Sequence, residues 1–378
     1  MNKAFNNFYF GKKVLITGHT GFKGAWLSII LRQLGASVIG VALDPPSKPS
    51  LFELAGLEAK VNHYHCDIRS SEELIAVFHK EQPEIVFHLA AQSIVLTSYD
   101  APMDTFSTNV MGTISILEAV RQTKSIKSAV IVTSDKCYEN KEWQYSYREN
   151  DHLGGLDPYS ASKGCAEIVM ASYYRSFFNS VNENENRIGI ASARAGNVIG
   201  GGDWSSYRLI PDIVRAISQN RKLEIRNINS YRPWQHVLDP LFGYLTLAWH
   251  IWQSPVVFSE AWNFGPLNTS NCSVRQVIDE VLKRWEIGRE IIQMANSKRH
   301  EAGFLSLDCS KARLGMDWFP VWGFEESIKN TIEWYQNYYD QGDAFDAVKE
   351  SEIQISKYMD DAFNKGLLWA QGILSKKE

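Results

Sequence analysis

Five side chains that can move protons lie in two short segments near the middle of the chain. Ser134, Asp135 and Lys136 are consecutive, and Tyr159 and Lys163 are four positions apart in a segment predicted to be helical. Residues four apart on a helix share a face, and an ammonium beside a phenol favours the phenolate. We therefore expect Lys163 to lower the pKa of Tyr159, with Ser134 binding the same substrate oxygen. Asp135 and Lys136 add a second acid and base.

Both sets also have a plainer interpretation. A Tyr and a Lys at this spacing are common by chance, and Asp135 with Lys136 could be a surface turn holding a neighbouring ion pair. Their positions favour chemistry, because Ser134 follows a predicted strand and Tyr159 opens the next helix. Burial or neighbouring cations would have to favour a neutral Lys136, and burial would have to favour a protonated Asp135.

The elements that must position these residues alternate in the first half of the chain. Short runs rich in Val and Ile, bounded by Gly, Asp or Ser, indicate strands at Lys13–Thr17, Ser37–Leu43, Val61–His65, Glu84–Leu89, Ser128–Thr133 and Arg187–Ala193. Helix-length segments separate them. This order predicts an α/β fold with a Rossmann-like, doubly wound parallel sheet, in which ligands bind beyond the C-terminal strand ends.

The second half lacks this regular order and is rich in Gly, Trp and Pro loops. We expect a dinucleotide-binding domain of residues 11–197 plus about 235–262. A smaller, mostly C-terminal α/β substrate lobe would comprise about 198–234 plus 263–343. Residues 344–378 are predicted to form a helical tail, packed on the body or on a partner subunit. Its apolar residues on one face are Ile355, Tyr358, Met359, Ala362 and Phe363.

The first predicted strand leads into a glycine-rich turn, Gly18-His-Thr-Gly21-Phe-Lys-Gly24. Such a turn lets backbone N–H groups approach a pyrophosphate at a helix N-terminus. Asp44 follows the second strand and can bind an adenosine ribose, which favours NAD over NADP, although an Asp before Pro45 is also a common turn former. The predicted cofactor-binding residues are Gly18, Thr20, Gly21, Phe22, Lys23, Gly24, Asp44, Asp67, Ile68, Leu89, Ala90, Ala91, Gln92, Thr108, Tyr159 and Lys163.

Composition narrows the range of partners. The net charge is −4 and the basic residues are scattered, so nucleic acid and an anionic membrane are not expected as partners. The N-terminus lacks the apolar core of a secretory signal, and no stretch is long and apolar enough to span a membrane, which favours the cytosol. The cysteines show no metal-ligand spacing, so reduced thiols and no metal are expected: Cys66, Cys137, Cys165, Cys272 and Cys309.

From about Gly11 to about Tyr335 the chain resembles the extended short-chain dehydrogenase/reductases, and within them the nucleotide-sugar 4,6-dehydratases. The segments that carry the resemblance are GHTGFKG at 18–24, HLAAQ at 88–92, STNVMGT at 107–113, TSDKCY at 133–138, YSASKG at 159–164, RAGNVIGGGDW at 194–204, RLIPD at 208–212 and RPWQHV at 232–237. Members that act on dTDP-glucose carry Thr-Asp-Glu in place of Ser134-Asp135-Lys136. The resemblance therefore favours the branch that acts on CDP-glucose.

The resemblance implies a lyase that makes CDP-4-keto-6-deoxy-D-glucose for deoxysugar synthesis in surface polysaccharide such as lipopolysaccharide O-antigen. Tyr159 would take the proton of the sugar 4-hydroxyl while NAD takes the C4 hydride. Lys136 would then remove the acidified C5 proton as Asp135 protonates the departing C6 hydroxyl. The hydride returns to C6, so no net redox change occurs and NAD is regenerated in each turnover.

The substrate-binding residues are less sharply indicated. Arginine forks suit a diphosphate, Asn197 could offer a backbone N–H, and Glu301 could bind the ribose, although surface charges or loop contacts explain each of these residues more plainly. The predicted set is Asn197, Arg208, Leu209, Arg232, His236 and Glu301, with packing as the plainer interpretation of His236. The helix Ser160–Phe178 is apolar on more than one face, and related enzymes pair through it and through the helix around Val110–Val120. A homodimer, or a pair of dimers, is expected.

Two other function classes remain. Another NDP-hexose 4,6-dehydratase, or a 4-epimerase of the same fold, would use the same nucleotide-sugar site, and an epimerase would release no water. A regulatory protein that senses NAD would need no chemistry. Such proteins commonly lose the Tyr or the Lys, whereas this chain keeps Ser134, Tyr159 and Lys163.

Overall fold

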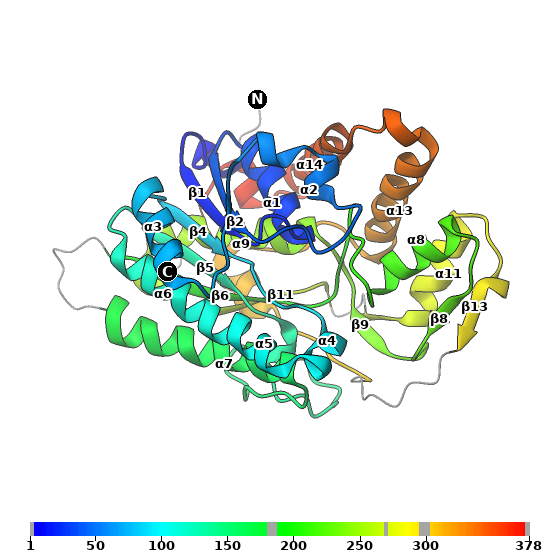
Figure 1. Cartoon of the computed structure of the whole chain (residues 1–378), viewed down its shortest axis with the longest axis horizontal. Helices are drawn as coiled ribbons and strands as arrows, with labels where there is room; N and C mark the ends of the chain where they lie inside the picture. Colours follow the sequence, from blue (N-terminus) through cyan, green and yellow to red (C-terminus); the bar gives the residue numbers. More distant parts are fainter. Residues whose placement is uncertain (1–3, 180–186, 268–270, 295–302, 375–378) are drawn as a thin grey trace.

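The computed structural model describes residues 4–179, 187–267, 271–294 and 303–374, and a seven-stranded parallel sheet forms its larger lobe (Figure 1). The strand order is β11-β6-β5-β4-β1-β2-β3. The bounds are β1 (Lys13–Thr17), β2 (Ser37–Ala42), β3 (Asn62–His65), β4 (Ile85–His88), β5 (Ser128–Val132), β6 (Gly189–Ala195) and β11 (Ala261–Phe264). The predicted doubly wound α/β fold is confirmed, and the six predicted strands coincide with β1 to β6. The sequence did not indicate β11.

Helices cover both faces of this sheet (Figure 1). One face carries α1 (Phe22–Gln33) and α9 (Leu238–Gln253), and the other carries α3 (Ser71–Glu81), α6 (Gly112–Gln122) and α7 (Pro158–Tyr173). Every residue of α9 from 238 to 251 is buried. A helix that is apolar all round has no solvent face, so α9 forms the centre of one layer.

The start of α7 follows from its local sequence. Asp157 is the N-cap and accepts a hydrogen bond from the Ser160 N–H at 2.9 Å, and Pro158 occupies the first helical position. The helix continues as a π-helical turn, Tyr174–Phe178, so the predicted helical segment 158–178 is confirmed. A second π-helical turn, Ser107–Met111, leads into α6.

The smaller lobe lies beyond one end of the sheet and contains α8 (Leu209–Ser218), α11 (Val274–Arg284) and two of three two-stranded ladders, whereas the third ladder, of residues 198–199 and 235–236, packs against α1 of the body (Figure 1). The ladders pair β7 (Val198–Ile199) with β10 (Gln235–His236), β8 (Leu223–Ile225) with β13 (Ile292–Met294), and β9 (Tyr231–Pro233) with β12 (Asn271–Ser273). Helix α13 (Phe324–Gln341) packs against α11 and β10. The smaller lobe is thereby tied to the body.

The tail forms α14 (Ala347–Asn364), which packs on α1 and α13. Four of its predicted apolar contacts, Ile355, Tyr358, Met359 and Ala362, are buried. Phe363 is 51% exposed, so its assignment to the packed face was wrong: only part of the predicted stripe faces the body. The remaining short helices are α2 (Leu51–Leu54), α4 (Val95–Asp100), α5 (Pro102–Phe106), α10 (Pro255–Phe258), α12 (Ser310–Met316) and α15 (Leu368–Gln371). Within the described ranges, none of the helices is long and apolar enough to cross a membrane.

The glycine-rich turn after β1 allows a matched stability test. Gly18 has φ +73°, and a Cβ there would lie 2.7 Å from the Ala90 backbone nitrogen, whereas Gly56 has φ +55° and open space around its Cβ position. Gly56→Ala should lose about 1 to 2 kcal/mol from the left-handed backbone alone. Gly18→Ala should lose at least about 1 kcal/mol more, because the Ala90 backbone must also move. Urea unfolding measures both, and equal losses would contradict the close packing at Gly18.

Candidate active site

A cavity of about 1940 Å³ lies between the C-terminal strand ends and the smaller lobe. All the predicted cofactor-binding and catalytic residues line it, together with four of the six predicted substrate-binding residues. Those four are Asn197, Arg208, Leu209 and Arg232. The fold therefore brings the two proton-transfer sets and the glycine-rich turn to one site.

The glycine-rich turn presents free N–H groups at the start of α1. The first N–H groups of α1 have no partner within the helix, as in any helix. Gly21, the N-cap, has no side chain that could accept from them. A Cβ on Gly24 would lie 2.2 Å from the Gly18 carbonyl oxygen, which explains the need for glycine there. The Thr20 hydroxyl donates to the Leu43 carbonyl at 2.9 Å and ties the turn to the end of β2. This arrangement suits a diphosphate.

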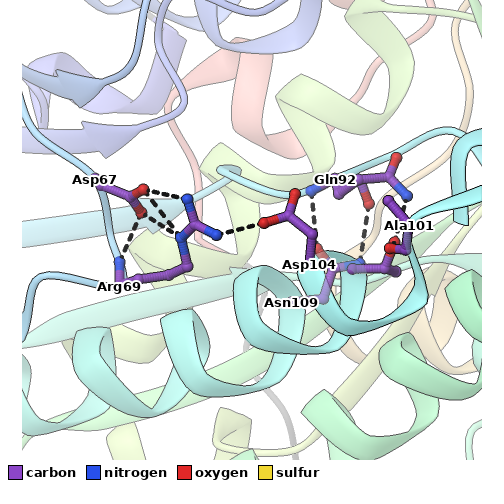
Figure 2. A network of polar contacts seen from close by, with 7 residues as sticks. Asp67, Arg69, Gln92, Ala101, Asp104 and Asn109 are labelled. Atoms are coloured by element: carbon purple, nitrogen blue, oxygen red, sulfur yellow. Dashed lines mark hydrogen bonds and ion pairs between the residues drawn. The ribbon is translucent and has the colours of Figure 1, made fainter.

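Two acidic residues lie where an adenosine would bind. The Asp44 side chain is 89% exposed, with one oxygen 3.4 Å from the His65 imidazole. Asp67 is held by Arg69, whose guanidinium also pairs with Asp104 (Figure 2). Side-chain hydrogen bonds from Arg69 lower the pKa of Asp67. Arg69 could not be recognised in this role from the sequence, because its partner Asp104 is distant along the chain.

A second group of contacts fixes the loop after β4. The Asn109 side chain accepts from the Gln92 N–H and donates to the Gln92 carbonyl, each at 2.9 Å (Figure 2). Its amide also donates to the Ser162 hydroxyl of α7 at 2.9 Å. Asn109 lies in the π-helical turn before α6, a distortion often found at functional sites. It therefore joins the cofactor side of the cavity to the helix that carries Tyr159.

The proton-transfer residues after β5 form a short 3-10 turn. The Ser134 hydroxyl accepts from the Lys136 N–H at 3.2 Å and donates to Asp135 Oδ1 at 3.0 Å. Lys136 Nζ lies 3.6 Å from the same Asp135 oxygen. Asp135 is 1% exposed, and its other oxygen, Oδ2, has no hydrogen-bond partner. A neighbouring ion pair is present, but it lies inside the cavity and not on a surface turn.

The ionisation of Tyr159 differs from the expectation. Burial raises the pKa of Tyr159 to about 12, and the hydrogen bond to Ser134 opposes this rise. Burial also lowers the pKa of Lys163 to about 8. The Lys163 amine donates to the Val132 carbonyl at 3.4 Å. The net shift of the Tyr159 pKa is therefore upward, because loss of hydration outweighs nearby positive charge, and the effect of Lys163 on Tyr159 stays a prediction.

A buried ion pair between Arg194 and Glu167 holds the turn that carries Ser134, Asp135 and Lys136. Arg194 of β6 and Glu167 of α7 are 3% and 2% exposed and form two hydrogen bonds, at 2.9 and 2.8 Å. Glu167 also accepts from the hydroxyl of Thr133, which precedes Ser134. Arg194 donates to the hydroxyl of Tyr138 at 2.7 Å. The residues on both sides of the turn are thus held by one pair.

Lys23, the second residue of α1, is a further charged group at the cavity. Its amine donates to the Tyr244 hydroxyl of α9 at 3.3 Å. Loss of hydration, with the positive charge of Arg208, lowers the pKa of Lys23 to about 7, although Asp135 acts in the opposite direction. The sequence indicated Lys23 only as part of the glycine-rich turn. Its charge interacts with those of Asp135 and Lys163.

The substrate side of the cavity is basic. Arg208 donates to Asp203 at 3.0 Å and to the Ser93 hydroxyl at 3.2 Å, so it connects the two lobes. Arg232, in β9, donates to the carbonyl oxygens of Tyr231 and Gly303. Further basic residues that the sequence did not single out line the cavity: Arg215, Arg221, Lys222 and Arg226. In the sequence these basic residues are scattered along one segment, as is typical of a solvated surface. The fold brings them to the same cavity.

Two predicted substrate residues are not placed in the cavity. His236 is fully buried in β10 and packs edge-on against Trp26 and Trp322, so its assignment to the substrate site is corrected. Its side chain faces the core between α1 and the segment before α13. Glu301 lies outside the described residues. Within the described ranges, no group of three or more His, Cys, Asp or Glu side chains could hold a metal ion.

Comparison with known proteins places the chain in a family. Residues 15–331 match the family described as GDP-mannose 4,6 dehydratase. The chain belongs to this family. It is 47% identical over 353 residues to the CDP-glucose 4,6-dehydratase of Salmonella typhimurium, covering 93% of this chain and 98% of that protein. It is thus a full-length homologue of that dehydratase.

Solved structures share the fold of this family member. A dTDP-glucose 4,6-dehydratase from Bacillus anthracis in complex with NAD has a TM-score of 0.71 at 21% identity, covering 87% of this chain and 98% of that chain. A UDP-glucuronic acid 4-epimerase from Bacillus cereus in complex with UDP-glucuronic acid and NAD has a TM-score of 0.73 at 20% identity, covering 86% and 100%. At these identities the likeness shows the fold alone.

The ionisation of Lys23 gives this GDP-mannose 4,6 dehydratase family member a pH-dependent stability. A folded-state pKa of about 7, against 10.5 when unfolded, means that Lys23 makes folding more favourable as pH rises from about 7 to 10.5. Lys23→Met should therefore be more stable than the parent near pH 6.5. Above pH 7 this difference in the free energy of unfolding should shrink by at most about 1.4 kcal/mol per pH unit. The change should be smaller than this limit because solvent screens a partly exposed amine.

Urea unfolding across this pH range measures the difference. Lys23→Arg is the control, because its guanidinium stays charged: its stability relative to Lys23→Met should stay constant across this pH range, while the parent gains on both variants. An advantage of Lys23→Met that is constant with pH would contradict the lowered pKa of Lys23.

Proposed function

We propose that this chain is a CDP-glucose 4,6-dehydratase, which converts CDP-D-glucose into CDP-4-keto-6-deoxy-D-glucose with loss of water. The observation that carries the proposal is the site itself. Ser134, Asp135 and Lys136 share one cavity with Tyr159 and Lys163, in a chain 47% identical along nearly its whole length to a dehydratase of that name. A hydride-transfer set alone would serve a dehydrogenase or an epimerase, and the additional acid and base suit elimination.

The residues present fit a bound NAD. Gly18 and Gly24 allow the tight turn that presents the start of α1 to a diphosphate, because a Cβ at either position would meet backbone atoms, and Asp44 lines the cavity at the strand end where a ribose diol would bind. When bound, NAD accepts the C4 hydrogen with its electron pair and later returns it to C6. Around it, Gln92 and Asn109 fix the loop that closes this side of the cavity. Asp44 disfavours a 2′-phosphate, which supports NAD over NADP.

The proposed proton-transfer roles are those that the family resemblance implies, and the shared cavity supports them. Tyr159 takes the proton of the 4-hydroxyl, and Ser134 hydrogen-bonds the same oxygen. The resulting C4 carbonyl acidifies the C5 hydrogen, which Lys136 removes. Asp135, buried with one unpartnered oxygen, protonates the departing C6 hydroxyl. Lys163, beside Tyr159 on α7, supplies positive charge that favours the phenolate once ligands fill the cavity.

The two lobes divide the binding. Residues 11–197 with about 235–262 hold the cofactor, and residues of about 198–234 with 263–343 hold the nucleotide sugar. Arg208 and Arg232 lie on the substrate side and would bind the diphosphate, with Asn197 and Leu209 beside them. Asp203 and Ser93 hold Arg208 in a fixed orientation, which suits recognition of a diphosphate.

Self-association is part of the proposal. Several apolar side chains on α5, α7 and the turn that follows α7 are exposed, including Met103 at 85%, Ile168 at 59% and Phe177 at 52% exposure. Apolar side chains on one face mark an interaction surface when they are contiguous. We expect a homodimer or a dimer of dimers, acting in the cytosol and supplying deoxysugar for a surface polysaccharide such as lipopolysaccharide O-antigen.

The function is tested by product mass. The protein with NAD is incubated separately with CDP-, dTDP-, UDP- and GDP-glucose. CDP-glucose should lose one water with no net accumulation of reduced NAD, and the other nucleotides should react more slowly. A product of unchanged mass from CDP-glucose would contradict the dehydratase and favour an epimerase.

The role of Lys136 is tested by separating oxidation from elimination. Lys136→Ala should still oxidise C4, so that the absorbance of reduced NAD accumulates on adding CDP-glucose. Water loss should fall by on the order of 100-fold or more, as expected when a general base is removed. Lys141→Ala, which removes the partner of the exposed Glu139 nearby, is the matched control. Normal elimination by Lys136→Ala would assign the base to another residue.

A further inference from the structure

A carboxylate lies close to Arg232, one of the two arginines proposed to bind the substrate diphosphate. Glu142 is exposed and lines the cavity, and its carboxylate accepts a hydrogen bond from the Gly303 N–H at 2.7 Å. The carbonyl of the same Gly303 accepts from the Arg232 guanidinium at 3.3 Å. One residue therefore connects Glu142 to Arg232. Since like charges repel, a carboxylate here is not explained by attraction to a diphosphate.

Backbone carbonyl groups hold the guanidinium of Arg232. It donates to the Tyr231 carbonyl at 2.8 Å as well as to that of Gly303. The Tyr231 N–H also donates to the Gly303 carbonyl, at 3.0 Å, so β9 and Gly303 are joined twice. A guanidinium carries five N–H donors, so it can make these contacts and also bind a phosphate. The position of Gly303 thereby helps to set the direction of the Arg232 side chain.

The turn that carries Glu142 is itself anchored. The Asn140 side chain accepts from the Glu142 N–H at 2.9 Å and donates to the Phe304 carbonyl at 3.0 Å. It also accepts from the Tyr147 hydroxyl at 3.1 Å. Glu142 has φ +53°, a left-handed conformation that is uncommon outside glycine and persists where surrounding contacts impose it. A fixed turn therefore presents the carboxylate to Gly303.

The same loop connects the smaller lobe to the body of the protein. Tyr147 is 2% exposed and is joined to residues 306–308 by two backbone hydrogen bonds of 2.9 Å. Its ring stacks on Tyr138, whose hydroxyl accepts from Arg194. Residues 303–308 are thus tied to the buried ion pair that also holds the proton-transfer turn.

We propose, resting on the proposed function, that Glu142 is a positioning residue: by holding the Gly303 N–H, it orients Arg232 toward the substrate diphosphate. Glu142 makes no contact with the substrate in this role. Its carboxylate fixes Gly303, the Gly303 carbonyl fixes the guanidinium, and the guanidinium binds the phosphate oxygens. A guanidinium that is already ordered loses less conformational freedom on binding, which favours affinity.

Glu142→Ala tests the proposal, because positioning and charge alone predict opposite signs. If only charge matters, removing a carboxylate near a bound diphosphate should strengthen binding. If Glu142 positions Arg232, CDP binding measured by titration calorimetry should weaken by roughly 3- to 10-fold, as expected for the loss of one hydrogen bond. Unchanged or tighter CDP binding would overturn the proposal.

Two further variants control for the charge. Glu139→Ala removes the same charge from an exposed neighbour that does not line the cavity, and it should bind CDP as the parent does. Glu142→Gln keeps an oxygen that can accept from the Gly303 N–H, so its CDP binding should be at least as strong as the parent's. Binding by Glu142→Gln as weak as that of Glu142→Ala would refute the role of this hydrogen bond.

A double-mutant cycle tests whether Glu142 acts through Arg232. In an Arg232→Ala background, Glu142→Ala should have no further effect on CDP binding. An equal loss in both backgrounds would mean that Glu142 contacts the nucleotide itself, contrary to the proposal.

Steady-state turnover separates positioning of the diphosphate from an effect on the proton-transfer turn. Glu142→Ala should raise the KM for CDP-glucose by a similar factor and leave kcat near the parent value, because the diphosphate is bound equally in the ground and transition states. A lower kcat with unchanged CDP affinity would contradict the proposal. A parent that binds CDP but forms no dehydrated product would refute the proposed function alone, and a parent that binds no CDP would refute both.

Discussion

The buried pair of Glu167 and Arg194 is the constraint on which the site depends. It joins α7 to β6 and, through the Thr133 and Tyr138 side chains, holds the turn that carries Ser134, Asp135 and Lys136. Ser192 also donates to Glu167, at 2.7 Å, so the carboxylate is fully engaged. Loss of one partner from a buried pair leaves an uncompensated charge and costs about 3 to 5 kcal/mol. The pair therefore holds the turn from Ser134 to Lys136 in a fixed position.

Next to this ion pair, the site contains buried side chains that can donate or accept protons. Burial makes the phenol of Tyr159 a weaker acid and the ammonium of Lys163 a stronger one. The same burial leaves Asp135 with an unpartnered oxygen. Such groups would be costly in a structural core, and they are favoured where a substrate completes their hydrogen bonds. In the proposed function, the cavity, the glycine-rich turn and the basic residues of the smaller lobe would position a sugar beside these groups.

Local sequence predicted the sheet and most of the site. The six predicted strands and the helix from residue 158 follow from β-rich runs, a capping Asp157 and Pro158. The glycine-rich turn and the segment from Ser134 to Lys136 were recognisable because the residues of each motif lie close together in the sequence. The catalytic roles themselves stay predictions.

Properties that depend on tertiary environment could not be predicted in the same way. The direction of the Tyr159 pKa shift depends on burial, and the burial of His236 depends on Trp322, far along the chain. The links from Arg69 to Asp104 and from Glu167 to Arg194 join residues of distant segments. Strand β11 is short, and its position beside β6 is set by packing and not by its own pattern. In each case a contact between distant segments decides the outcome.

In the proposed reaction, oxidation at C4 serves elimination across C5 and C6. CDP-glucose labelled with deuterium at C4 tests this directly when the label is located in the product by NMR. The deuterium should move to C6 of a dehydrated product, in the same molecule and without exchange with solvent. Deuterium that remains at C4, or is lost to solvent, would contradict it.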